Sequence, residues 1–85
     1  MNRPEAAILL GVAAAFDQRT IGETDVTAWA EALARYDLEP CRRAVIGHYT
    51  ETTDRIMPAH ITRRIRAVRP EDRTVAEVLA EQAGY

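Results

Sequence analysis

Apolar side chains recur every three or four residues in several stretches of the chain, which is the spacing of one face of a helix. The first stretch carries this face at Ile8, Leu9, Val12 and Phe16. Before it, Asn2 can accept a hydrogen bond from a free amide of the first turn, and Glu5 completes a capping-box pattern. The pattern predicts a first helix that begins at Asn2 and ends near Asp17.

A second apolar repeat follows a loop that contains Gly22. Thr24 or Asp25 can cap a helix N-terminus, so a second helix is predicted from there to about Tyr36. Its apolar face comprises Val26, Trp29, Leu33 and Tyr36. Because these large side chains recur at helical spacing, Trp29 is predicted to belong to the core rather than to a ligand platform.

A third helix is predicted to begin at Pro40, because proline has no amide hydrogen to donate and is tolerated in a first turn. One face of this helix is suited to the core and consists of Ala44, Val45, His48 and Tyr49. Gly47 lies beside this face and allows a neighbouring element to come close. The polar segment 50–57 then predicts a loop.

Pro58 opens a fourth predicted helix, which extends to about Val68. Its apolar stripe consists of Ile61, Ile65 and Val68. The rest of its circumference carries arginines, at Arg63, Arg64 and Arg66, with Arg69 at the end. A helix with this distribution packs along one narrow stripe and presents a cationic surface elsewhere.

The segment that follows, residues 70–85, has a weaker pattern. Residues 74–77 repeat the capping box, and the apolar residues that could face a neighbour are Val75, Val78 and Leu79. Such a short segment is predicted either to form a fifth helix or to become ordered only on a partner. We therefore predict an all-α fold, in which a compact bundle of four helices forms a core domain of residues 1–69 and a short C-terminal helix or partner-binding tail follows.

Length and composition limit what this fold can hold. A chain of 85 residues buries one modest core and leaves little room for an active-site cleft. Alanine-rich, arginine-rich and lysine-free usage is typical of a helical protein from a GC-rich genome. The apolar run 6–16 is too short to span a bilayer, and Glu5 beside it is unlike the flank of a secretion signal. With a single cysteine, Cys41, an internal disulfide is excluded, so we expect a cytoplasmic protein without a membrane anchor.

Charge is unevenly distributed along the chain. All 11 basic residues are arginines, and the segment 41–69 is strongly basic although the whole chain has a net charge of −2. The arginines of this segment are Arg42, Arg43, Arg55, Arg63, Arg64, Arg66 and Arg69. Arginine pairs bidentately with carboxylate and phosphate groups. The cluster is therefore either a solvated face that pairs with the chain's own acids or a site for an anionic partner.

Catalytic and metal-binding chemistry is poorly supported by the sequence. A nucleophile needs a positioned base, and neither His48 nor His60 has a partner at a diagnostic spacing. The spacing of Cys41, His48 and His60 matches no zinc pattern, and the glycines form no phosphate-binding loop. His48 is expected at the edge of the core and His60 in solvent. We expect a protein that is not an enzyme and uses no metal or cofactor.

Three patterns of the chain carry a likeness to a known family: Trp29-x3-Leu33, Ala44-Val45-x2-His48-Tyr49 and Met57-Pro58-x2-Ile61-x3-Ile65. Together they resemble the N-terminal helical domain of the small phage proteins that load or inhibit the replicative helicase. The likeness covers residues 5–69. It implies a non-enzymatic adaptor that binds the helicase hexamer, restrains its ATPase and delivers it to an origin-bound initiator. Family loaders have a longer C-terminal region implicated in helicase contact. Two alternatives follow for this chain: residues 74–85 are its shortened equivalent, or the loading function is lost and only the fold and one interaction are retained.

The function expected on this basis is binding alone. The arginines would engage an acidic surface of a replicative helicase or of another host or phage replication protein, and the apolar residues of the tail would dock as a short amphipathic helix. The predicted partner-binding residues are Arg63, Arg64, Arg66, Arg69, Val75, Val78 and Leu79. Two alternatives stay open: a nucleic-acid-binding regulator that uses the fourth helix, and a phage inhibitor of another host protein. The acidic balance of the whole chain makes nucleic acid the secondary choice.

Overall fold

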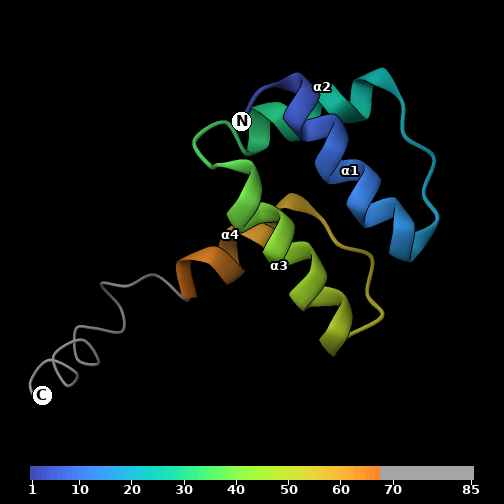
Figure 1. Cartoon of the computed structure of the whole chain (residues 1–85), viewed down its shortest axis with the longest axis vertical. Coiled ribbons are helices and arrows are strands. Elements are labelled where there is room, and N and C mark those ends of the chain that lie inside the picture. The colour runs from blue at the N-terminus through green and yellow to red at the C-terminus, as the bar shows by residue number, and fades with distance from the viewer. Residues whose placement is uncertain (68–85) are drawn as a thin grey trace, which may run out of the picture.

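The computed structural model describes residues 1–67, and these residues contain four helices (Figure 1). They are α1 (Arg3–Asp17), α2 (Glu23–Ala32), α3 (Leu38–Glu51) and α4 (Pro58–Ala67). α1 packs on both α2 and α3, and α4 packs on α3 (Figure 1). The predicted all-α bundle of four helices is confirmed, whereas the predicted C-terminal helix lies outside the described residues.

α1 begins as its capping-box pattern predicts. The backbone N–H of Glu5 donates to Asn2 Oδ1 at 2.9 Å, and the backbone N–H of Asn2 donates to Glu5 Oε1 at 3.0 Å. Gln18 closes the helix in the left-handed conformation, with φ of 62°, and its N–H donates to the carbonyl oxygen of Ala14. Both ends of α1 therefore satisfy backbone groups that a helix otherwise leaves without partners.

The predicted inner face of α1 is correct at Leu9 and wrong at Ile8 and Phe16. Ile8 and Phe16 are 54% and 48% exposed, and Val12 is only half-buried. Leu9 is fully buried together with Ala6, Leu10 and Ala13. Because α1 contacts both α2 and α3, its buried face is the one that points between these two helices. The small side chains of Ala6 and Ala13 on this face allow both helices to approach.

α2 begins earlier and ends earlier than predicted. Gly22 is its N-cap, and the N–H of Gly22 donates to the Asp25 carboxylate at 2.8 Å. After Ala32 the chain enters a turn, so Leu33 and Tyr36 lie beyond the helix. Leu33 nevertheless stays fully buried. The apolar repeat thus identifies core residues correctly on both sides of a helix end.

α3 starts at Leu38 rather than at Pro40 and continues to Glu51. Pro40 therefore lies within the first turn, where its missing amide hydrogen removes no hydrogen bond. The loop that follows is residues 52–57, shorter than the predicted segment 50–57.

The core lies where α1, α2 and α3 meet and extends to the loop and to α4. Its largest fully buried side chains are Leu9, Leu10, Leu33, Cys41, Val45, Ile56 and Ile61. Trp29 is 5% exposed, which confirms its predicted place in the core. Within the described residues α4 contributes one buried side chain, Ile61, so most of its circumference is left for solvent or a partner.

Candidate functional site

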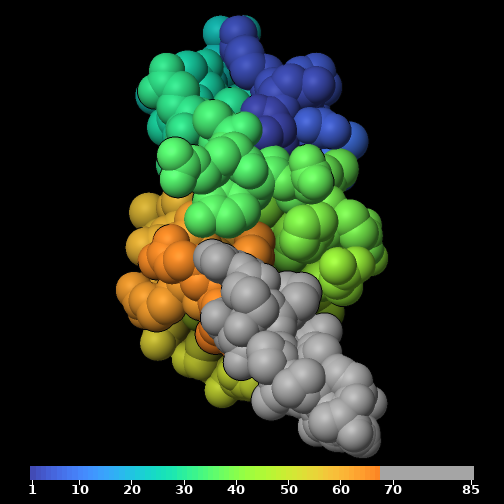
Figure 2. Space-filling model, turned by 90° about the vertical axis from the view of Figure 1, so that its left-hand side faces the viewer, coloured from blue at the N-terminus to red at the C-terminus, as the bar shows by residue number. Residues whose placement is uncertain are grey.

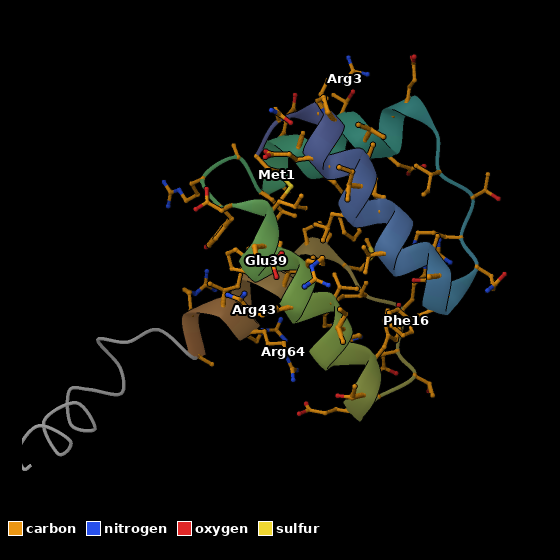
Figure 3. All side chains as sticks on the ribbon, viewed as in Figure 1. Met1, Arg3, Phe16, Glu39, Arg43 and Arg64 are labelled. Carbon is orange, nitrogen blue, oxygen red and sulfur yellow. The ribbon has the colours of Figure 1, made fainter. Side chains whose placement is uncertain are left out.

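The candidate site is the surface formed by α3 and α4, which contains most of the arginine-rich segment. Figure 2 shows α4, in orange, at the surface of the molecule beside green residues of α3. Arg43 on α3 and Arg64 on α4 extend toward the space between the two helices (Figure 3). We call this surface the α3–α4 face and define it by Pro40, Arg43, Ala44, Gly47, Arg63, Arg64, Ile65 and Arg66.

An open groove of about 260 Å³ lies on this face between the two helices. It is lined by Pro40, Arg43, Ala44, Gly47, Arg64 and Ile65. Three of these six residues, Pro40, Ala44 and Ile65, have apolar side chains and two are arginines, so the groove offers both apolar contacts and guanidinium groups. This combination suits an amphipathic segment that carries acidic residues.

Arg42 and Arg43 both pair with one carboxylate of their own helix. Arg42 Nη2 lies 2.7 Å from Glu39 Oε2, and Arg43 Nη1 lies 3.4 Å from the same oxygen. The hydrogen bond from Arg42 lowers the pKa of Glu39, and Arg43 adds to this effect. All three side chains are solvent-exposed, so these pairs contribute little to stability and are readily exchanged for a partner's acid.

Arg64 makes two contacts that the sequence does not reveal, one with Glu51 and one with Gly47. Its Nη1 donates to Glu51 Oε1 at 3.1 Å and its Nη2 lies 3.1 Å from Glu51 Oε2, which is a bidentate pair. Its guanidinium packs directly on Gly47, where a Cβ atom would lie 2.9 Å from both Nε and Nη2. Glycine at this position therefore permits the close approach that was predicted for it, and the occupant is the arginine of α4.

Replacing Gly47 with alanine is expected to displace the Arg64 guanidinium while leaving the helices in place. The added methyl meets only the far end of a flexible side chain. Alanine favours a helix over glycine by about 1 kcal/mol, which offsets the loss of the Arg64–Glu51 pair, because an exposed ion pair contributes little to stability. The thermal midpoint of Gly47→Ala should stay equal or rise slightly, and the NMR signal of Arg64 Nε–H should move. A clear fall in the midpoint would mean that backbone, rather than the arginine, has to shift.

Three other arginines of the basic segment extend into solvent. Arg63 and Arg66 on α4 and Arg55 in the loop are exposed, and none of them forms an ion pair with the residues that the structure describes. Within the described part of the basic segment, residues 41–67, they are therefore the cations most accessible to a partner. The remaining predicted site residues, Arg69, Val75, Val78 and Leu79, lie outside the described residues.

A buried ion pair at the end of α1 was not predicted from the sequence. The side chains of Arg19 and Asp17 are 6% and 10% exposed. Arg19 Nε donates to Asp17 Oδ1 at 2.9 Å, and Tyr49 Oη donates to Asp17 Oδ2 at 2.6 Å. The hydrogen bond from Arg19, opposed by burial and reinforced by Tyr49, lowers the pKa of the Asp17 carboxyl to about 2. Asp17 is therefore ionised at neutral pH.

The same network fastens the loop that leads into α4. The N–H of Ile56 donates to Tyr49 Oη at 2.8 Å, and Arg19 Nη2 donates to the carbonyl oxygen of Ile56 at 2.8 Å. Arg19 also lies over the ring of Trp29, with its Cζ atom 5.2 Å from the ring centroid. These contacts connect α1, α2 and α3 to the residue that precedes Met57 and Pro58, and so they position the start of α4.

The two histidines lie together between α3 and α4. His48 is 6% exposed, and its Nε2 lies 2.7 Å from the carbonyl oxygen of Asp54. His60 is half-buried, which makes its predicted solvent position wrong: its Nδ1 accepts a hydrogen bond of 2.9 Å from the N–H of Met57. The ring folds back to satisfy a free amide at the start of α4. The two ring centroids are 4.8 Å apart.

The remaining reactive side chain, the thiol of Cys41, lies in the core. Cys41 is fully buried, and burial raises the pKa of its thiol to about 11, so the nucleophilic thiolate is disfavoured at neutral pH. In the described part of the chain, no three His, Cys, Asp or Glu side chains gather into a metal-binding group. Among the helices of residues 1–67, none combines the length and apolarity that a membrane crossing requires.

Comparison with known proteins assigns no family. No protein-family model, curated protein or solved structure matches the chain. The resemblance to phage helicase loaders stays a prediction, and the function has to be argued from the α3–α4 face.

Proposed function

We propose that this protein is a binding module that uses the α3–α4 face to hold an acidic, partly apolar segment of a partner protein. The observation that carries the proposal is the groove between α3 and α4, whose lining combines the apolar Ala44 and Ile65 with Arg43 and Arg64. Apolar contact supplies affinity in such a groove, and the guanidinium groups select for acids beside the apolar residues.

The residues that line the groove favour binding over catalysis. Its lining comprises proline, alanine, glycine, isoleucine and two arginines. None of these side chains is a nucleophile or a general base at neutral pH, because the guanidinium group stays protonated. We therefore assign to this groove recognition rather than bond-making chemistry.

A protein partner is favoured over a nucleic acid by the charges on the face. Two acids, Glu39 and Glu51, lie among its arginines and already neutralise part of their charge. Binding to a phosphate backbone needs a row of cations, and the whole chain has a net charge of −2. A partner segment with separate acidic residues fits this alternating surface better than a continuous row of phosphates.

The partner that the sequence resemblance indicates is the hexameric replicative helicase. On this proposal the chain is a phage or prophage replication accessory protein that loads or inhibits the helicase by contact alone. The residues Trp29, Val45 and Ile61, which carry the resemblance, are buried, and core residues of this kind specify a fold rather than a partner. The helicase is therefore proposed as the partner because of the sequence resemblance, whereas a binding module is proposed because of the groove.

The test is to mix the purified chain with the replicative helicase of its host, with and without ATP, and to measure the mass of the eluted species by size exclusion with light scattering. A complex that contains both proteins is the expected result. Separate elution together with a salt-sensitive shift of a DNA fragment would overturn the proposal in favour of a nucleic-acid-binding regulator.

A further inference from the structure

A second pocket lies beside the groove and shares one of its walls. It has a volume of about 290 Å³ and is lined by His48, His60, Arg63, Arg64 and Ala67. Arg64 lines both this pocket and the groove. Four of the lining side chains carry ring or guanidinium nitrogens, and none is an acid. The wall is therefore suited to an anion.

His60 contributes a hydrogen-bond donor to this pocket. Because its Nδ1 accepts from the N–H of Met57, the neutral ring carries its proton on Nε2. This Nε2–H has no hydrogen-bond partner among the described residues. The ring thus offers an N–H to a bound anion without having to become charged.

His48 fixes the orientation of that ring. The carbonyl oxygen of Asp54 can only accept, so His48 Nε2 donates to it, and the nearly buried ring is held in place. The ring of His60 lies against it at 4.8 Å with an angle of 44° between the planes. A donor whose direction is set in advance binds an anion with less loss of conformational freedom.

The two arginines of the pocket supply its charge. Arg63 is exposed and forms no ion pair with residues 1–67. Arg64 already binds one carboxylate, that of Glu51, whose side chain is 66% exposed. This pair shows that a guanidinium group of the wall binds a carboxylate. Because the pair is solvent-exposed, the carboxylate of an incoming acid can replace that of Glu51.

We propose that this pocket is a carboxylate-binding subsite, which takes the side chain of a glutamate or aspartate from the partner segment that lies in the groove. This inference rests on the proposed function and specifies its ligand chemistry. Arg64 borders both cavities, so the groove and the pocket are adjacent. A partner segment that places an apolar residue in the groove can therefore place a neighbouring acidic residue in the pocket. Phosphate groups would meet the same nitrogens, but Glu39 and Glu51 on this surface oppose a chain of phosphates more than a single carboxylate.

Two substitutions of His60 separate anion binding from the structural role of the ring. His60 occupies the position from which a glutamate or glutamine side chain also accepts the first free N–H of a helix. His60→Glu keeps this cap and places a negative charge in the pocket. His60→Gln keeps the cap and leaves a neutral donor. Both variants should fold, with thermal midpoints close to that of the original chain.

The probe is N-acetylglutamate methylamide, with its glutamine analogue as the uncharged control, added to the full-length ¹⁵N-labelled chain. We expect saturable shifts of the His60 and Arg63 side-chain signals with the glutamate probe at millimolar concentration and none with the glutamine probe. His60→Gln should bind the glutamate probe within about threefold of the original chain, and His60→Glu at least about tenfold more weakly, because like charges repel across the pocket. Arg63→Gln, which changes an exposed side chain, should also weaken binding.

Three results would overturn the inference. The first is an absence of saturable shifts, and the second is equal binding to His60→Glu and His60→Gln. The third is inorganic phosphate binding at least about tenfold more tightly than the glutamate probe, which would indicate a phosphate-bearing partner. Because this titration needs no helicase, a failure here with an intact helicase complex would refute the subsite alone, and the reverse pattern would refute the proposed partner alone.

Discussion

Arg19→Met is expected to lower the free energy of unfolding by about 3 kcal/mol at pH 7, because it leaves the buried Asp17 carboxylate without its cation. The substitution also removes the donor to the Ile56 carbonyl group and the contact with the Trp29 ring. Both losses loosen the loop that precedes α4. Urea unfolding followed by circular dichroism measures the difference.

The control for this prediction is Arg42→Met. Arg42 forms an ion pair of the same type, with Glu39, but on the exposed surface of α3. Its removal should leave the free energy of unfolding nearly unchanged, because solvent screens an exposed ion pair. Equal losses for Arg19→Met and Arg42→Met would show that the buried network contributes no more than a surface pair.

The same network makes stability depend on acid. The folded-state pKa of Asp17 is about 2, below the ordinary value of 3.8. A depressed pKa contributes stability that is complete above the ordinary value and is lost as the pH falls toward the folded value. The original chain should therefore lose stability between about pH 4 and pH 2, and this part of the loss should be smaller in Arg19→Met. Thermal midpoints measured across this range give both curves.

Reversing the two exposed charges of α4, in Arg63→Glu with Arg66→Glu, is expected to weaken partner binding on the order of a hundredfold. Both side chains are exposed and form no ion pair within the described residues, so the thermal midpoint should hardly change. Each reversal replaces an attraction to the partner's acids with a repulsion. The loss should be larger at low salt, because screening reduces both effects.

The control for charge reversal is Arg3→Glu. Arg3 lies at the start of α1, at the end of the molecule opposite to α4 (Figure 3). A reversal there alters the overall charge without touching the α3–α4 face, so partner affinity should change less than about twofold. A large loss of affinity in Arg3→Glu would indicate that binding follows net charge rather than this face.

Local patterns were sufficient to predict the four helices of residues 1–67 and the start of α1. The Asn2–Glu5 capping box and the prolines at positions 40 and 58 mark helix starts through backbone hydrogen bonding, which depends on neighbouring residues alone. The N-terminus of α2 offered several capping residues within a few positions. The structure uses Gly22 with the side chain of Asp25, a choice that composition does not determine.

The buried face of α1 could not be predicted from periodicity, because residues 6–16 are apolar or small on every side. In such a helix the inner face is decided by the position of its neighbours. Ile8 and Phe16 are exposed for this reason, although both are as apolar as Leu9 and Leu10. Phe16 instead stacks on the ring of Tyr49, with centroids 5.2 Å apart.

The arginine-rich surface that we propose for binding was predicted in location but not in its contacts. The excess of arginine between residues 41 and 69 identified the α3–α4 face, since charge clusters are visible in the sequence. Which arginines are available depends on contacts across the fold, such as Arg64 with Glu51 and Gly47. The pair of Asp17 and Arg19 was missed for a related reason: it joins the last residue of α1 to the loop that follows, and its third member, Tyr49, comes from α3.

Isothermal titration of the host's replicative helicase with the original chain, the Arg63→Glu and Arg66→Glu double variant and Arg3→Glu tests most directly whether the α3–α4 face binds an acidic partner. The expected result is a measurable affinity for the original chain, nearly the same affinity for Arg3→Glu, and a loss on the order of a hundredfold for the double variant. Equal affinities of the original chain and the double variant, with both of them folded, would contradict the assignment of binding to this face.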